Sequence, residues 1–335
     1  MSDFKPSAVE NPEIKVARAD DAQIIDRGYR PYEGLRTGLP QLISSVVVYS
    51  AKYVLGIGRK FRYKIFPAIA LIIAIFPALV FVGLSFVPDW DLQETDILPA
   101  YHLYYEWPMV IAIVMFISFG VPDILVADRR NGMMDFYFST PLRLWSYLTS
   151  KVLAVFVTML IITITPILLL LVAYVQEDAG PSGVDEWLIL LARILLGGIA
   201  AAGIIAATTM TIASFVDRRG LAAASVLLLL LGSAFLTTIL ARGGTGAWVY
   251  SFNIPEIYIE SVNRIYGVLP EYVFLGEGIG SAGLQSPGVT PTQLGVNPVS
   301  ISDLSTLLLV LSYVGWIALS SAAIWFRYRR LVVSR

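Results

Sequence analysis

The sequence predicts an all-α membrane protein with six transmembrane helices, and three observations carry that prediction. Hydrophobic residues make up 56% of the 335 residues and charged residues only 15%, whereas a soluble domain averages about 45–50% apolar and about 25% charged. Six apolar runs are long enough, at about 20 residues or more, to cross a bilayer core of about 30 Å as helices. Finally, Lys and Arg fall almost entirely on one side of these runs.

The six predicted spans follow a polar N-terminal stretch. They are Ile65–Val87, Trp107–Ala127, Tyr147–Val175, Trp187–Phe215, Leu221–Ala241 and Leu304–Phe326. Pro67, Pro77 and Pro166 lie inside such runs, where proline is tolerated and indicates a kink. Trp107 and Trp187 begin two of the spans, where an indole ring favours the membrane interface.

The basic residues predict how the spans are oriented. The connections 88–106 and 176–186 contain acidic residues but neither Lys nor Arg, whereas 21 of the 24 basic residues lie in segments on the opposite side. The positive-inside rule therefore places both termini in the cytoplasm. Arg193, inside the fourth span, is expected to extend its side chain to the outer interface, and contact with a substrate is the alternative.

The chain divides into four predicted parts. Residues 1–40 form a cytoplasmic tail, 41–64 an amphipathic connecting helix, 65–326 the six-span domain and 327–335 a basic cytoplasmic tail. On a helical projection of 41–64, Lys52, Arg59 and Arg62 gather opposite a broad apolar arc, which is typical of a helix that lies along the inner leaflet. A seventh span is the alternative, but it would put the N-terminus outside.

The connection before the sixth span, residues 242–303, is predicted to be a long extracellular loop. Asn253, Ile254 and Pro255 favour the start of a short helix, and Glu256, Glu260 and Arg264 would then share one face. The glycine- and proline-rich stretch 276–298 indicates irregular structure. Residues 269–275 between them are apolar enough to dip into the outer leaflet.

The connection after the second span is the most informative cytoplasmic segment. It places apolar and aromatic side chains where a loop is ordinarily polar, and charged residues surround them: Asp128, Arg129, Arg130, Gly132, Met133, Met134, Asp135, Phe136, Tyr137 and Phe138. Such a surface is typical of a site where a partner docks. The alternative is that these side chains fold back onto the protein's own helices. A second acid-Arg-Arg-Gly sequence follows the fourth span and adds Arg218 and Arg219.

Several kinds of chemistry are excluded. The chain has no cysteine and one histidine, His102, which excludes disulfides, thiolate sites and multi-histidine metal sites. The motifs GxxxxGK[ST], HExxH and GxSxG are absent, so no nucleotide-hydrolysing loop or common hydrolase site is present. The net charge of −1 gives no reason to expect nucleic acid as a partner.

The connection after the second span resembles the type-2 ABC transporter permeases, the ABC-2 membrane family of bacteria. That family carries an acid, a glycine four residues later, a second acid, a Ser/Thr-Pro pair and a lysine in the third span. The matching residues are Asp128, Arg129, Gly132, Asp135, Thr140-Pro141 and Lys151, with aspartate where the family more often has glutamate. Residues 27–34 resemble a tract that precedes the first span in some bacterial members.

The resemblance implies a permease subunit of an exporter in the bacterial plasma membrane, with no enzymatic activity and no cofactor of its own. Two permease chains, identical or different, would pair within the lipid, and two copies of a separate ATP-binding subunit would bind ATP and Mg²⁺. Segment 128–140 would couple to that ATPase, and 216–220 would be a minor contact. The alternatives are an ABC-type assembly that transmits motion to an outer partner without exporting cargo, an ion-coupled secondary transporter and a membrane-bound enzyme. The span centres carry few ionisable residues, which counts against ion coupling.

Overall fold

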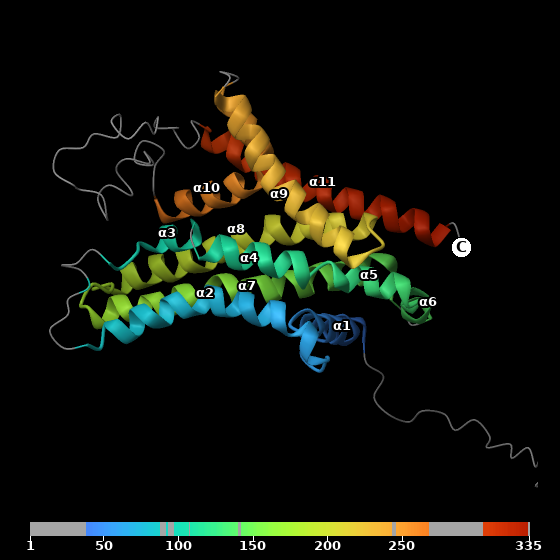
Figure 1. Ribbon diagram of the computed structural model, residues 1–335, viewed down its shortest axis with the longest axis horizontal. Coiled ribbons are helices and arrows are strands. Elements are labelled where there is room, and N and C mark those ends of the chain that lie inside the picture. Colours follow the sequence, from blue (N-terminus) through green and yellow to red (C-terminus); the bar gives the residue numbers. More distant parts are fainter. Residues whose placement is uncertain are drawn as a thin grey trace, which may run out of the picture. The chain divides into compact units, whose positions relative to one another are not determined.

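The computed structural model describes residues 38–87, 92, 97–106, 108–139, 142–242, 246–267 and 304–333. The elements in chain order are α1 (Leu39–Val54), η2 (Phe61–Tyr63), α2 (Ile65–Leu84), α3 (Tyr101–Glu106), α4 (Met109–Phe119), α5 (Asp123–Arg130), α6 (Met133–Phe138), α7 (Leu144–Gln176), α8 (Val184–Phe215), α9 (Arg219–Arg242), η3 (Ala247–Phe252), α10 (Ile254–Tyr266) and α11 (Thr306–Val333). Within these ranges there is no strand (Figure 1). The predicted structure of 27–34, 269–275 and 276–298 lies outside them.

Six helical segments are long and apolar enough to cross a membrane, which confirms the predicted number of spans. They are Ile65–Leu84, Tyr101–Arg130, Leu144–Gln176, Val184–Phe215, Gly220–Ala241 and Thr306–Leu331. In Figure 1, α2, α7 and α8 run side by side, and α4 lies between α2 and α8. The connection between α7 and α8 therefore lies at the opposite end of the bundle from α5 and α6.

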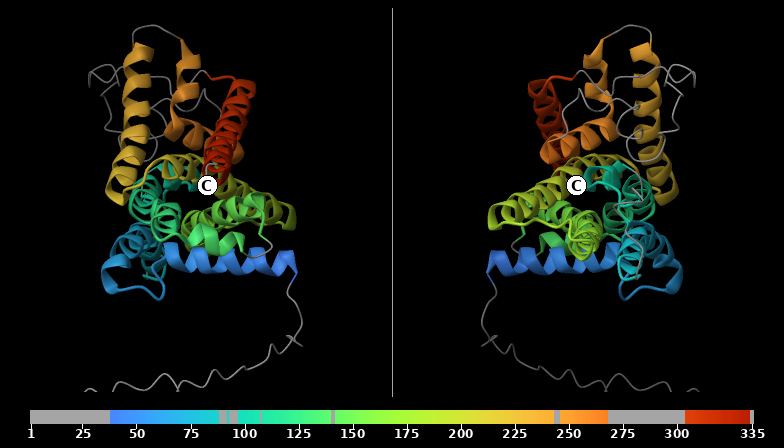
Figure 2. Two further views of the ribbon diagram at one scale, coloured as in Figure 1. Left: turned by 90° about the vertical axis from the view of Figure 1, so that its right-hand side faces the viewer. Right: turned by 90° about the vertical axis from the view of Figure 1, so that its left-hand side faces the viewer.

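The connecting helix is shorter than the amphipathic pattern suggests. Instead of continuing to residue 64, α1 ends at Val54, because Gly56 and Gly58 take left-handed backbone angles, with φ of 74° and 79°. The chain turns there and enters α2. Figure 2 shows α1 lying crosswise to the long helices, as expected of a helix that lies along a membrane surface rather than across it.

The second span is divided into several helical pieces rather than one helix. It begins at Tyr101 as α3, and α4 and α5 are separated at Gly120–Pro122. Pro122 cannot donate the hydrogen bond that would continue α4, and it stands at the N-cap of α5. The break separates α5 from α4, while Ile124, Leu125 and Val126 of α5 remain buried. Thr140 and Pro141 of the family pattern lie outside the described residues, and α7 begins at Leu144.

Small residues allow the central helices to pack closely. On α2, Ala70, Ala74 and Ala78 are fully buried at four-residue spacing. On α8, a Cβ on Gly198 would lie 2.5 Å from the Ile164 side chain, and one on Gly203 would lie 2.5 Å from the Tyr313 hydroxyl. These glycines are therefore required for helix contact, the common use of small residues in membranes.

The short helix predicted in the outer connection is confirmed as α10. Its N-cap is Asn253, whose side-chain oxygen accepts a hydrogen bond from the Glu256 backbone nitrogen at 3.3 Å. Glu260 and Arg264 form an ion pair at 2.9 Å on one face of α10. The Asn263 amide donates to Glu106 of α3 at 3.1 Å, so polar contacts hold α10 against the bundle.

Candidate functional site

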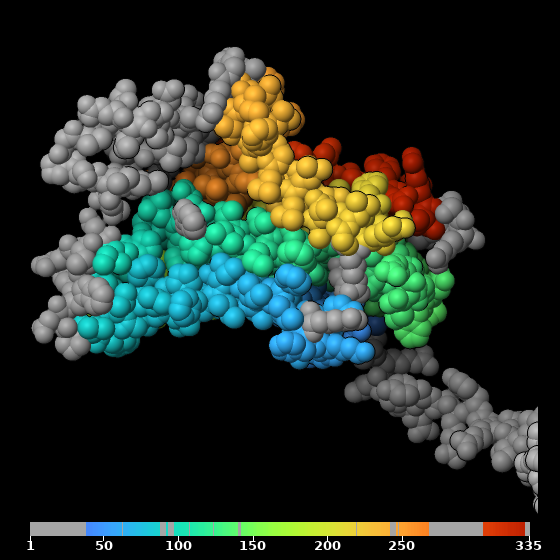
Figure 3. All heavy atoms as spheres, viewed as in Figure 1, coloured from blue at the N-terminus to red at the C-terminus, as the bar shows by residue number. Residues whose placement is uncertain are grey.

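The predicted docking segment lies where α5, α6, the α8–α9 turn and the last turns of α11 come together. We call this end of the bundle the basic end, because it carries most of the described arginines. Figure 3 shows α6 at the surface of this end, beside α11. Gly132 separates α5 from α6 in the left-handed region, with φ of 64°, so glycine is the residue that permits this tight turn.

The apolar residues of α6 divide between its two faces. Phe136 is 66% exposed and Met133 38%, and Met133 also lines a small cavity beside Tyr49 and Tyr53 of α1. Met134 is buried, while the rings of Tyr137 and Phe138 pack against Tyr147 of α7, with centroids 5.2 and 6.0 Å apart. The cluster thus contains an exposed pair that can contact a partner and an inner set that fixes α6 to the bundle.

A buried ion pair joins α5 to α7. The Lys151 ammonium lies 2.8 Å from the Asp128 carboxylate, and Lys151 is only 2% exposed. The Tyr147 hydroxyl donates a hydrogen bond to the same carboxylate at 2.8 Å, and the ammonium also lies 5.2 Å from the Tyr137 ring centroid. Both charges are therefore compensated within the protein. Burial, with the nearby Asp128 charge, raises the pKa of Tyr137 to about 12, so its hydroxyl stays protonated at neutral pH.

Arg129 joins α5 to the end of α8. Its guanidinium donates hydrogen bonds to the backbone oxygens of Ala213 and Ser214 at 2.8 Å each, to that of Val216, and to the Tyr328 hydroxyl of α11 at 3.1 Å. Its Nε also lies 3.4 Å from the Asp217 carboxylate. The last carbonyls of a helix have no partner within it and carry partial negative charge, so a guanidinium is well suited to them. One side chain thus connects three elements.

The remaining predicted site residues are distributed over this surface. Asp135, Arg130, Gly132 and Arg218 are exposed, whereas the side chain of Arg219 is outside the described set. Arg129 is only 10% exposed, so its contacts are mainly internal. The prediction that Arg129 forms part of a charged rim is untested, but most of its hydrogen-bonding capacity is directed at α8.

The two acid-Arg-Arg segments share one pocket. A cavity of about 310 Å³ lies between α6, the α8–α9 turn and α11, and its walls are Arg129, Met134, Asp135, Phe138, Asp217, Arg327 and Leu331. Arg327 and Leu331 were not expected in the site, because sequence spacing gives no sign that the end of α11 returns to α6. The cavity combines apolar walls with charges of both signs, as suits a protein side chain or loop.

Arg193 does reach the end of the bundle opposite to the basic end. Its guanidinium nitrogen lies 3.5 Å from the position that a Cβ on Gly267 would take, at the C-terminal end of α10. A positive charge beside the last turn of a helix is favourable. Its position supports an anchoring role.

Comparison with known proteins identifies the family to which this chain belongs. No curated protein sequence matches this chain. The family model described as "ABC-2 family transporter protein" matches residues 100–323, a region that runs from the second span into the sixth and includes α5, α6 and the α8–α9 turn. With about two thirds of its length matched, this multi-pass membrane protein belongs to the ABC-2 transporter family, whose members are the membrane subunits of ABC transporters rather than their ATPases.

Proposed function

We propose that this chain is the permease of an ABC exporter whose basic end faces the cytoplasm and docks a separate ATP-binding subunit through α6 and the α8–α9 turn. The observation that carries the proposal is the exposed pair Met133 and Phe136, mounted on a helix that is otherwise held firmly by buried contacts. Aromatic side chains exposed on a rigid support are the usual centres of protein–protein contact energy. Family membership favours an ATP-driven machine over an ion-coupled transporter.

The internal contacts suggest how movement of the ATPase would reach the spans. A push on α6 would act on α5, whose Asp128 is tied to α7 and whose Arg129 is tied to α8 and α11. Hydrogen-bonded and ion-paired contacts transmit a displacement because the partners must move together or lose their compensation. Three spans would therefore respond to one docking helix.

The expected assembly follows the family pattern. Two copies of this chain, or this chain and a related one, would pair in a bacterial plasma membrane with two ATP-binding subunits, which supply the sites for ATP and Mg²⁺. The cytoplasmic position of the basic end agrees with the excess of Lys and Arg there.

A substitution at Phe136 tests the docking proposal. Phe136→Asp places a charge at the exposed centre of the contact without disturbing the buried face of α6. We expect the ATP-binding subunit to co-purify at least tenfold less well with this variant, while Phe136→Leu, which keeps an apolar side chain, retains most of the association.

A separate variant serves as the control for the folding of α6. Tyr137 packs inside, so Tyr137→Phe keeps the ring and should retain docking, whereas Tyr137→Asp would perturb the fold and cannot serve as the test. Undiminished co-purification of Phe136→Asp, with normal yield and thermal stability in detergent, would refute the docking assignment.

A further inference from the structure

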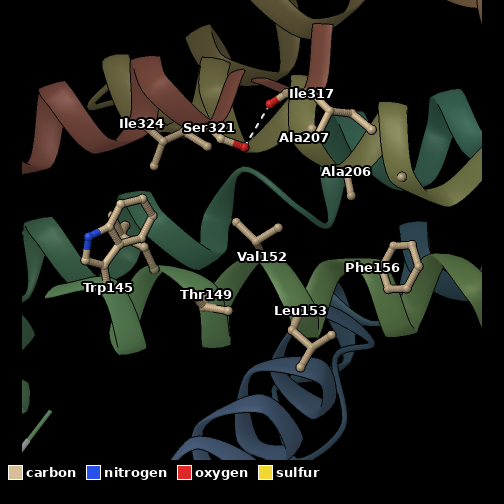
Figure 4. Close-up of a pocket in the computed structure, with 12 residues that line it drawn as sticks. Trp145, Thr149, Val152, Leu153, Phe156, Ala206, Ala207, Ile317, Ser321 and Ile324 are labelled. Carbon is tan, nitrogen blue, oxygen red and sulfur yellow. Dashed lines mark hydrogen bonds between the residues drawn. The ribbon is translucent and has the colours of Figure 1, made fainter. Parts of the chain in front are cut away.

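A second cavity lies between the spans and plays no part in the proposed docking. It is lined by residues of α7, α8 and α11 and has a volume of about 350 Å³. Figure 4 shows Trp145 and Val152 of α7 across the cavity from Ile324 and Ser321 of α11, with Phe156 of α7 at its other end, facing Ala206 of α8. The lining side chains are almost entirely apolar, so water is a poor occupant.

The lining of the cavity favours a flexible occupant. On the α8 side, the recess is lined by Gly203, Ala206 and Ala207, which add little or no side chain to fill it. A flexible hydrocarbon chain fits such a recess better than a helix does.

The cavity opens towards the surroundings of the bundle. Trp145 is 56% exposed and Leu153 39%, and both belong to a span, so the opening faces lipid hydrocarbon. At its end nearest the basic end, Trp145 stacks on Trp325 with ring centroids 4.2 Å apart and planes 13° apart. Tryptophan marks the level where hydrocarbon meets headgroups.

Two exposed arginines lie just beyond this tryptophan pair. Arg143 directly precedes α7 and is two residues before Trp145, and Arg329 is one helical turn beyond Trp325 on the same side of α11. Guanidinium groups bind phosphate through paired hydrogen bonds. Arg330, the next residue, projects about 100° further around the helix, away from that side.

From these features we infer that the cavity holds one acyl chain of a resident anionic phospholipid, whose phosphate is bound by Arg143 and Arg329. Three features match the parts of such a lipid in order along its length. The apolar cavity matches the acyl chain, the tryptophan pair matches the interface between hydrocarbon and headgroup, and the two arginines match the phosphate. Basic pockets between spans are suited to anionic headgroups. This site is independent of the ATPase docking surface.

The test measures lipid retention by the full chain purified in detergent. Dioleoyl phosphatidylglycerol and dioleoyl phosphatidylcholine are titrated back onto the protein, and bound lipid is counted by native mass spectrometry. We expect the wild type to keep one phosphatidylglycerol with at least fivefold preference over phosphatidylcholine. Equal retention of the two lipids would overturn the proposal.

Variants separate the chain site from the headgroup site. Val152→Phe fills the cavity and should lower retention of both lipids at least tenfold, with Leu228→Phe on the exposed face of α9 as its matched control. Arg143→Gln with Arg329→Gln should abolish the preference for phosphatidylglycerol, whereas Arg330→Gln should leave it unchanged. Wild-type retention by Val152→Phe would overturn the proposal.

If Val152→Phe does not fold, a measurement on the protein that retains Val152 still decides between the outcomes. Phosphatidylglycerol with brominated acyl chains quenches nearby indoles, and we expect quenching that saturates at one lipid per chain and decreases in Trp145→Phe. Quenching without saturation would contradict a site. Loss of the bound lipid when the ATPase turns over would identify it as cargo, and loss of permease pairing in Val152→Phe would identify a subunit interface; either result would overturn a resident lipid.

Discussion

The two short helices α6 and α10 are held in place by the same means but present opposite surfaces. Arg129 anchors the α5–α6 segment to the last carbonyls of α8, and Arg264 anchors α10 to Leu304 and Thr306 at the start of α11. Each arginine also has a carboxylate partner, Asp217 in one case and Glu260 in the other. The α5–α6 segment and α10 are therefore each joined by a guanidinium to a distant part of the chain.

The difference lies in what faces outward. On α6, Phe136 is exposed. The charged side chains of Arg130 and Asp135, near the buried Asp128–Lys151 pair, also lie at the surface. On α10, the polar groups point inward: Glu260 and Asn263 are each only 1% exposed. The comparison indicates that α6 is built to meet another molecule, while α10 is built to close one end of the bundle.

The largest expected effect comes from breaking the buried pair behind α6. Lys151→Met keeps the length of the side chain but leaves Asp128 without its cation. Removing one partner of a buried ion pair costs about 3–5 kcal/mol, and we expect a loss of this order in the free energy of unfolding, measured by denaturant titration in detergent.

A double variant distinguishes lost compensation from lost packing. Asp128→Asn combined with Lys151→Met removes both charges and retains an acceptor for the Tyr147 hydroxyl, so it should recover most of the stability lost by the single variant. If the double variant is no more stable than Lys151→Met alone, the cost is one of packing and the ion pair is not the anchor of α5.

The two arginines offer a direct test of the contrast between α6 and α10. Arg129→Gln and Arg264→Gln each remove charge-assisted hydrogen bonds to helix ends, and each should cost about 2–3 kcal/mol of stability. Of the two variants, only Arg129→Gln should also reduce the stimulation of ATPase activity by the permease, because Arg129 links the docking segment to the spans and Arg264 does not. Equal loss of stimulation in both variants would remove the functional distinction between the two helices.

The number of spans and the existence of α10 could be predicted from the sequence, because apolar length and a capping asparagine are local signals. The end of α1 at Val54 was missed because the apolar pattern continues beyond it; Gly56 and Gly58 were the available sign. The break in the second span had a similar sign in Gly120 and Pro122. Turn-forming residues within an otherwise apolar run deserved more weight than the periodicity.

The candidate docking segment could be proposed from the sequence, but its internal division could not. The sequence places Met134, Phe136 and Tyr137 in one cluster, and only the packing of α6 on Tyr147 separates inner from outer side chains. The pairing of Asp128 with Lys151 crosses more than 20 residues, and the contact of Arg129 with α8 crosses more than 80, so neither follows from local spacing. Such contacts depend on tertiary arrangement, which periodicity does not report.

The smallest expected effect concerns the inward-facing acids of α10 and their response to pH. Burial, together with the nearby charges of Glu260 and Glu106, raises the pKa of Glu256 from 4.5 to about 7. The folded protein therefore binds a proton between these pH values that the unfolded chain releases, so stability should fall as pH rises from about 4.5 to about 7. Because Glu256 is partly accessible, we expect a decrease of about 1–2 kcal/mol rather than the full value of the shift.

Glu256→Gln removes this titration and should make the variant more stable than the wild type at pH 8 but not at pH 5, as measured by thermal unfolding in detergent at a series of pH values. Asp185→Asn, an exposed acid near the start of α8, is the matched control and should follow the wild-type profile. The uncharged α6 variants Phe136→Leu and Tyr137→Phe should keep the wild-type pH dependence. The carboxylates behind α6, Asp128 and Asp217, are paired with cations, whereas Glu256 lies near other carboxylates. A pH profile that is unchanged by Glu256→Gln would mean that α10 accommodates its acids as ionised groups. The contrast between α6 as a docking helix and α10 as a closing helix would then rest on the exposure of their side chains alone.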